Sequence, residues 1–271
     1  MDPEADLYFR NLDGRSSVLA ELDLRGKTIR NEVVLKSSVR GPGALLQSYG
    51  FALDCQGVRF YEGEATFGYF GREQLIRQTS SGKSEVSSQG SDRMAAQRTI
   101  RIPATPGAAA QRLNLVRELK VDRDTSERGR VQLRGFGAIS PTDWYFAAHF
   151  FQDPVMPGSL GVEAAVQALV AYGCWRWPHL AAQPVHHRIN HPLDWHYRRQ
   201  ITPEDAGFQV QVDVSSIEET PSGVVLSGDA RVWRESAGHR DAEKPASLIY
   251  KVSGLAVQLG STEDHSLIGQ V

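Results

Sequence analysis

Residues 149–169 combine a histidine, a proline-restricted turn and a carboxylic acid set in an apolar run. The segment reads HFFQDPVMPGSLGVEAAVQAL, so a turn containing Pro157 separates His149 from Glu163. A histidine can serve as a general base, and a carboxyl group that burial keeps protonated near neutral pH can serve as a general acid. Because backbone N–H groups lie between the two, this one segment contains the parts of an acid–base catalytic site.

The element expected to carry the acid is a buried helix. Pro157 precedes the predicted helix, Ser159 is a good N-cap, and the run 160–177 contains no proline and is rich in Ala, Leu and Val. Glu163 and Gln167 are four residues apart and therefore share one face. The positions around them are almost all apolar, which predicts a helix buried on nearly every side.

Both candidate residues also have a purely structural interpretation. Glu163 lies in the first helical turn, where the helix N-terminus favours a negative charge by about 0.3 to 1 kcal/mol. His149 could be a histidine at the edge of the core that donates to a backbone carbonyl. Neither residue alone predicts catalysis, and it is their occurrence on one short segment that favours it.

The rest of the chain predicts antiparallel sheet. Short stretches of alternating apolar and polar residues, separated by turn residues, predict strands on both sides of the helix. Their ranges are 17–24, 29–39, 44–55 and 58–70, then 113–122, 129–139, 208–217, 223–233 and 247–259. Strands, one long apolar helix and several further long strands predict an α+β fold.

The composition of successive segments predicts the domain organisation. Residues 1–78 form a strand-rich N-terminal unit, and 79–111 are polar, small and proline-containing, as in a flexible linker. Residues 112–260 form a second unit that contains the helix, and 261–271 form a tail. The chain also contains a possible internal repeat. The segment LRGKTIRNEVVLKSS is followed by two long strands, with the same order and rough spacing as YRRQITPEDAGFQVQVDVSS and the two strands after it. Chance similarity is the alternative explanation. If the repeat is real, the N-terminal unit matches only the later strands of the second unit and lacks the long helix.

Composition excludes several classes of protein. The 271 residues are 41% hydrophobic and 23% charged, with 30 Lys and Arg against 32 Asp and Glu, so bulk charge favours neither nucleic acid nor membrane. Cys55 and Cys174 are far apart, which fits a reducing compartment. The N-terminus lacks a signal-peptide pattern, and no apolar run reaches the roughly 18 residues that span a bilayer. We therefore expect a cytoplasmic protein.

A histidine-rich stretch offers a metal site as a rival interpretation. His186, His187, His191 and His196 lie close together, and His187 and His191 have the spacing of two zinc ligands on a helix. Pro192 and the absence of a HExxH pattern weaken this hypothesis. We expect structural or surface histidines and no metal.

The segment HFFQDPVMPGSLGVEAAVQ resembles the signature of the hot-dog-fold 3-hydroxyacyl-ACP dehydratases. It is similar in particular to the 3-hydroxydecanoyl-ACP dehydratase/isomerase family and to the dehydratase domains of polyunsaturated fatty acid synthases. The similarity covers roughly residues 113–260 and extends more weakly to the N-terminal section. It implies an antiparallel sheet wrapped around a long central helix, and two such units side by side. We expect a double hot dog with an incomplete N-terminal unit.

The resemblance also implies roles for individual residues. His149 would be the catalytic base that removes a proton from C2, and Glu163 the acid that protonates the leaving C3 hydroxyl, giving a 2-enoyl thioester. The dehydratase/isomerase has Asp at the acid position, so Glu163 leaves isomerase activity open. The Gly158 N–H, with Ser159, would bind the thioester oxygen. The supporting residues would be Gln167, Asp153 and Pro157. No metal or redox cofactor is implied, because the substrate arrives on the phosphopantetheine arm of an acyl carrier protein.

The family pattern raises the question of what completes the site. In paired hot dogs each site takes its histidine from one unit and its acid from the other, whereas this chain has one full motif. Either two copies exchange His149 and Glu163, or the chain is part of a larger polyunsaturated fatty acid or polyketide synthase; we favour a synthase segment that forms a homodimer. A non-catalytic acyl-binding or scaffolding domain and a hot-dog thioesterase are the alternative functions.

Overall fold

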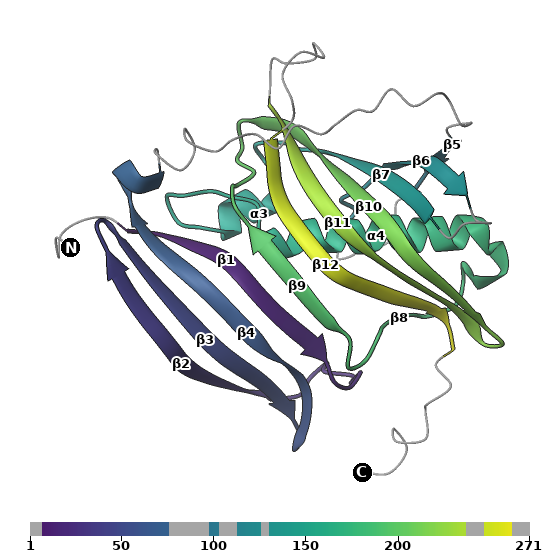
Figure 1. Ribbon diagram of the computed structural model, residues 1–271, viewed down its shortest axis with the longest axis horizontal. Helices are drawn as coiled ribbons and strands as arrows, with labels where there is room; N and C mark the ends of the chain where they lie inside the picture. The colour runs from purple at the N-terminus through teal and green to yellow at the C-terminus, as the bar shows by residue number, and fades with distance from the viewer. Residues whose placement is uncertain (1–6, 76–97, 103–112, 126–129, 237–246, 262–271) are drawn as a thin grey trace.

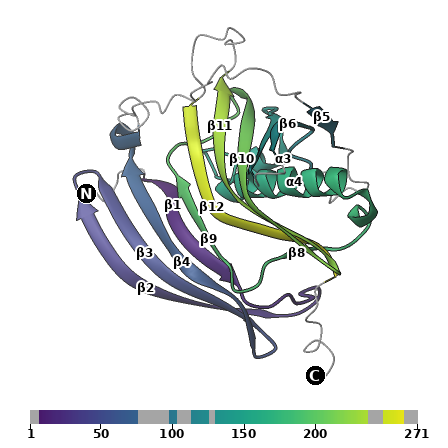
Figure 2. The same cartoon turned by 45° about the vertical axis from the view of Figure 1, so that its right-hand side comes forward.

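The computed structural model describes residues 7–75, 98–102, 113–125, 130–236 and 247–261 (Figure 1). Their strands form one curved 12-stranded sheet in the order β2-β3-β4-β1-β9-β12-β11-β10-β7-β6-β5, with β8 beside β12. The pairings are antiparallel. The predicted fold class is confirmed, because this sheet curves around one long helix (Figures 1 and 2).

The N-terminal unit is a four-stranded antiparallel sheet. It consists of β1 (Leu7–Val18), β2 (Ile29–Gly41), β3 (Ala44–Cys55) and β4 (Val58–Gly71). Strands β2 to β4 lie where alternation predicts them. The strand predicted at 17–24 is wrong, because β1 covers Leu7–Val18 and residues 19–24 are not in a strand. No long helix packs on this unit among its described residues, as Figure 2 shows.

The C-terminal unit carries the long helix. Its elements are β5 (Arg98–Arg101), β6 (Glu118–Thr125), β7 (Arg130–Ala138), α3 (Trp144–Ala148), α4 (Gly158–Arg176), a 3-10 turn (Pro178–Leu180), β8 (Val185–His187), β9 (Pro192–Tyr197), β10 (Asp205–Thr220), β11 (Gly223–Ser236) and β12 (Ser247–Gly260). Strand β5 falls inside the segment predicted to be a linker, where it pairs with β6. Residues 79–97, 103–111 and 262–271 of the predicted linker and tail lie outside the described residues.

The two units repeat one strand order about their junction. From that junction outward the N-terminal unit runs β1-β4-β3-β2, and the C-terminal unit runs β9-β12-β11-β10. Strands β2 and β10 contain the two similar sequences, so the topology agrees with the predicted repeat. Strand β1 pairs with β9, with Asp13 opposite His196 and Ser17 opposite Pro192. The N-terminal unit therefore occupies the place that a second hot dog would take beside the first.

Helix α4 supplies one side of the core. Leu160, Ala164, Ala168 and Leu169 are buried against the strands of the C-terminal unit. The opposite side, which includes Val162 and the residues one and two turns later, is only partly buried. The prediction of a helix buried on nearly every side is thus correct for one side only, because the N-terminal unit presents no described helix to the other.

Candidate functional site

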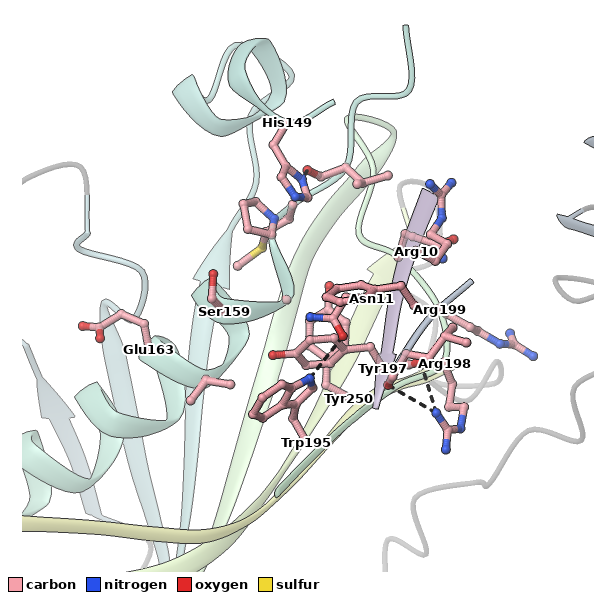
Figure 3. Close-up of a pocket in the computed structure, with 18 of the residues that line it drawn as sticks. Arg10, Asn11, His149, Ser159, Glu163, Trp195, Tyr197, Arg198, Arg199 and Tyr250 are labelled. Atoms are coloured by element: carbon pink, nitrogen blue, oxygen red, sulfur yellow. Dashed lines mark hydrogen bonds between the residues drawn. The ribbon is translucent and has the colours of Figure 1, made fainter. Parts of the chain in front are cut away.

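A cavity of about 470 Å³ lies between the two units (Figure 3). The N-terminal unit lines it with side chains of β1 and β4, and the C-terminal unit lines it with the segment after α3, the first turns of α4, and strands β9 and β12. Of the residues predicted for the site, His149, Pro157, Gly158, Ser159 and Glu163 all line this one cavity. Gln167 and Asp153 contact lining residues from outside it.

The His149 ring is held by its own loop. Its Nδ1 atom lies 3.0 Å from the carbonyl oxygen of Val155, and the Val155 N–H donates to the His149 carbonyl at 2.9 Å. A carbonyl oxygen can only accept, so Nδ1 carries the proton and Nε2 of the neutral ring has a free lone pair. The backbone bond expected of a structural histidine therefore also prepares Nε2 to act as a base.

The turn before α4 differs in one detail from the prediction. The helix begins at Gly158 with Pro157 as the N-cap residue, and no side-chain hydrogen bond caps it. Ser159 is exposed and lies one residue inside the helix, so the prediction that Ser159 is the N-cap is wrong. The extended backbone of Pro157, with ψ of 133°, ends the turn before Ser159 is reached.

Gly158 allows the helix start to approach an aromatic ring closely. A Cβ atom at this position would lie 2.4 Å from Cε2 of Tyr197, which is closer than any side chain tolerates. As the first helical residue, Gly158 has no intrahelical acceptor for its N–H. The glycine thus places a backbone donor, at the positive end of the α4 dipole, on the wall of the cavity.

Glu163 is held by Gln167, as predicted, but it is less buried than predicted. Gln167 Nε2 donates to Glu163 Oε1 at 2.8 Å, while Gln167 Oε1 accepts from the N–H groups of Leu115 at 3.1 Å and Val116 at 3.2 Å. Glu163 is only half-buried, because it lies on the partly covered side of α4. Figure 3 shows its carboxylate directed away from His149, so the two groups do not face each other in this conformation.

Asp153 connects the histidine loop to the N-terminal unit. Both of its oxygens accept hydrogen bonds from the guanidinium of Arg10 on β1, one of them at 3.1 Å. Next to this ion pair, the rings of Phe9 and Phe150 meet edge to face with centroids 5.5 Å apart. A strand more than a hundred residues away in the sequence therefore holds the loop that carries His149.

Sequence reasoning missed the part of the site that the N-terminal unit and strand β9 supply. Arg10 and Asn11 lie in β1, and Asn11 accepts a hydrogen bond from Trp195 Nε1 at 3.2 Å (Figure 3). Tyr197, also on β9, is buried, and its burial raises its pKa above the ordinary value. The predicted repeat was the signal that could have drawn attention to β1, because side-by-side pairing of the units brings β1 against β9.

The histidine-rich stretch has no helical geometry. His187 lies in β8 and His191 in the turn before β9, so their spacing is not that of two ligands on a helix. His186 contacts Glu21 at 2.5 Å, and His196 contacts Asp13 at 2.7 Å. Within the described part of the chain, no three His, Cys, Asp or Glu side chains are grouped as metal ligands. In the same part of the chain, no helix has both the length and the hydropathy to cross a bilayer.

Comparison with known families decides the assignment of the C-terminal unit. Residues 108–237 match the family model of the FabA-like domain. These residues form a FabA-like domain. The resemblance carried by residues 149–167 is therefore confirmed at the level of this hot-dog domain. The FabA-like domain includes His149, Glu163 and the whole of α4.

The chain is also similar to one of the subunits of a polyunsaturated fatty acid synthase from Thraustochytrium sp. The two are 29% identical over 95% of this chain, but the chain spans only 18% of that protein's length. The similarity extends beyond the FabA-like domain, because it includes the N-terminal unit as well. The predicted similarity of the N-terminal section to such synthases is thus confirmed.

Solved structures give more distant likenesses. A Mycobacterium tuberculosis protein with a double hot-dog fold is 13% identical, covers 93% of this chain and 75% of its own, and has a TM-score of 0.49. A MaoC-like dehydratase from Phytophthora capsici is 12% identical over 97% of this chain and 74% of its own, with a TM-score of 0.42. An acyl-CoA thioesterase II from Mycobacterium marinum is 11% identical over 98% of this chain and 84% of its own, with a TM-score of 0.39.

Proposed function

We propose that the chain is a dehydratase domain that converts a 3-hydroxyacyl thioester into a 2-enoyl thioester. The observation that carries this proposal is the state of His149. Its Nδ1–H donates to the Val155 carbonyl, so Nε2 is available as a base. His149 and Gly158 line the same cavity. A base beside a backbone donor suits removal of a proton next to a carbonyl.

The reaction would use the Gly158 N–H, the His149 base and the Glu163 acid. The thioester oxygen accepts a hydrogen bond from the Gly158 N–H, and the helix dipole stabilises the enolate-like charge that develops there. His149 Nε2 takes the proton from C2, Glu163 gives a proton to the C3 hydroxyl, and the C3–O bond breaks to release water. Among the described residues that line the cavity, Glu163 is the one carboxylic acid, which supports its assignment.

The acid must change its orientation to act in this way. The Glu163 carboxyl group is turned toward Gln167 and away from His149 (Figure 3). Rotation about the Glu163 side-chain bonds would bring the carboxyl group toward the substrate. We propose that both residues act within one chain, since the N-terminal unit already occupies the position beside β9 where a second hot dog would pair.

The similarity to part of a polyunsaturated fatty acid synthase supports the identity of the substrate carrier. We propose an acyl carrier protein whose phosphopantetheine arm delivers a 3-hydroxyacyl chain. The reaction as written moves protons and water only, so we propose that it needs no metal or redox cofactor.

Incubation with a 3-hydroxyacyl thioester tests the proposal. A dehydratase produces enoyl absorbance without free thiol, a thioesterase releases free thiol, and a domain that only binds acyl chains produces neither. We expect the first result, and either of the others would remove the dehydratase assignment. The position of the double bond in the product then separates dehydration alone from dehydration with isomerisation.

Mixing two inactive variants tests whether one chain holds the site. His149→Ala and Glu163→Gln are purified separately, combined and allowed to exchange protomers. If both residues act in one chain, the mixture stays as inactive as its components. Recovery of up to a quarter of the parent turnover would instead place the site across two copies of the chain.

A further inference from the structure

Arg10 is a buried cation in the N-terminal unit, and its ionic partner belongs to the histidine loop. The side chain is 9% exposed, and the guanidinium contacts both oxygens of Asp153. From this geometry we propose that Arg10 is a positioning residue, which sets the orientation of His149 through Asp153. This role rests on the proposed function of His149, and it gives the N-terminal unit a task in the reaction.

The geometry of the ion pair fixes the position of the Asp153 side chain, in addition to neutralising its charge. Nη1 and Nη2 of Arg10 each donate to a different oxygen of Asp153, the forked arrangement that a guanidinium forms with a carboxylate. Nη1 also donates to the Phe9 carbonyl at 2.7 Å, which ties the fork to the backbone of β1. Because both partners are largely buried, water does not replace either bond easily.

The loop transmits the position of Asp153 to His149. The Asp153 N–H donates to the Phe150 carbonyl at 3.3 Å, and the Phe150 N–H donates to the Asp153 carbonyl at 3.2 Å. Phe150 is the neighbour of His149, and the Phe9 ring supports it from β1. A shift of Asp153 would therefore move Phe150 and weaken the bond between His149 Nδ1 and the Val155 carbonyl.

A direct role of Arg10 in substrate binding is the rival explanation, because the side chain lines the cavity. Both terminal nitrogens already donate to Asp153. A phosphate of the substrate would therefore have to share the guanidinium with a carboxylate that already binds both terminal nitrogens. The geometry thus favours an action of Arg10 through the loop over one on the substrate.

Kinetics of Arg10→Met separates the two roles. If Arg10 positions His149, kcat falls about 10- to 100-fold. KM stays within about twofold, because the substrate contacts are unchanged. The loss is the same for a 3-hydroxyacyl-CoA and for a 3-hydroxyacyl N-acetylcysteamine thioester, which has no phosphate. A loss confined to KM of the CoA substrate would assign Arg10 to phosphate binding and overturn the proposal.

Three further variants complete the kinetic test. Arg15→Met is the matched control, since Arg15 lies on the same strand, pairs with Asp194 across the same junction at 3.8 Å, and is exposed; it should leave kcat unchanged. Arg10→Lys should restore kcat only in part, because an ammonium lacks the fork. The double variant Arg10→Met with Asp153→Asn should be no slower than the slower single variant. Additive losses would show that the two residues act separately.

An NMR measurement tests the positioning without any turnover. Long-range ¹H–¹⁵N spectra of the imidazoles report which ring nitrogen of His149 is protonated, and His149→Asn assigns the signal by its loss. We expect one Nδ1–H tautomer in the parent and in Arg15→Met, and a mixture of tautomers in Arg10→Met. If Arg10→Met does not fold, Asp153→Asn is read by the same spectra.

The two kinds of failure remain distinguishable. A parent protein without dehydratase activity would contradict the proposed function, and the spectra would still test the link from Arg10 to His149. An unchanged His149 tautomer in the folded Arg10 or Asp153 variant would overturn the positioning role, whatever the parent's activity.

Discussion

The Nδ1 atom of His149 lies 3.0 Å from the carbonyl oxygen of Val155 on the same loop. This bond decides between the roles of the two ring nitrogens, because a carbonyl holds the proton on Nδ1 and leaves Nε2 available. The loop therefore fixes both the direction and the tautomer of the ring.

Replacement of the acid should stop turnover without unfolding the protein. Glu163→Gln keeps a side chain that can bond with Gln167 but has no proton of suitable acidity to give. We expect kcat for dehydration to fall by about 10² to 10⁴. Glu218→Gln is the control, since Glu218 is an exposed acid on β10 that pairs with Arg188 outside the cavity. Equal kcat for Glu163→Gln and the parent would remove Glu163 from the mechanism.

Gln167 should matter for stability as well as for the acid. Gln167→Leu leaves the buried N–H groups of Leu115 and Val116 without their acceptor, at a cost of about 1 to 3 kcal/mol. Urea unfolding measures this loss. Gln47→Leu provides the comparison. Gln47 bonds with the hydroxyl groups of Ser38 and Tyr49, which can form hydrogen bonds with water instead. Similar free energies of unfolding for the two variants would contradict the importance assigned to the Gln167 bonds.

The start of α4 should not tolerate a methyl group. In Gly158→Ala the new Cβ would press against the buried ring of Tyr197, and we expect a loss of about 1 to 3 kcal/mol in the free energy of unfolding. Gly41→Ala is the matched control, because nothing lies within 4 Å of a Cβ atom at that position. Thermal and urea unfolding compare the two, and a Gly158→Ala protein as stable as the control would mean that Tyr197 moves aside freely.

The strands that alternate regularly were predictable, and the contacts between the two units were not. Strand β3 has the predicted bounds and β4 extends one residue beyond them, because turn glycines mark their ends. Strand β9 was missed, since it is short and starts with a proline. The pairing of β9 with β1 and the Arg10–Asp153 ion pair both join residues that are far apart in the chain. Local periodicity of the sequence gives no information on such contacts. The partial exposure of Glu163 likewise depends on what the other unit presents.

Stability should fall at high pH because of buried tyrosines. Burial raises the pKa values of Tyr145, Tyr197 and Tyr250 above those of tyrosine in an unfolded chain, about 10. A raised pKa in the folded state contributes stability that is complete below pH 10 and is lost as the pH rises further. We expect the free energy of unfolding to be level up to about pH 9.5 and to decline above it.

Tyr197→Phe tests the cause of this decline. The variant lacks one of the buried hydroxyl groups, so its free energy of unfolding should decline less steeply above pH 10 than that of the parent. Urea unfolding at a series of pH values gives both slopes. Identical slopes would show that ionisation of Tyr197 does not contribute to alkaline unfolding.

The turnover of His149→Asn with a 3-hydroxyacyl thioester tests the proposed reaction most directly. The asparagine amide can donate to the Val155 carbonyl in place of Nδ1, so the loop keeps its bond while the base is lost. We predict a folded protein that forms enoyl thioester at least about 100-fold more slowly than the parent. Enoyl formation at the parent's rate by this variant would contradict the assignment of His149 as the base.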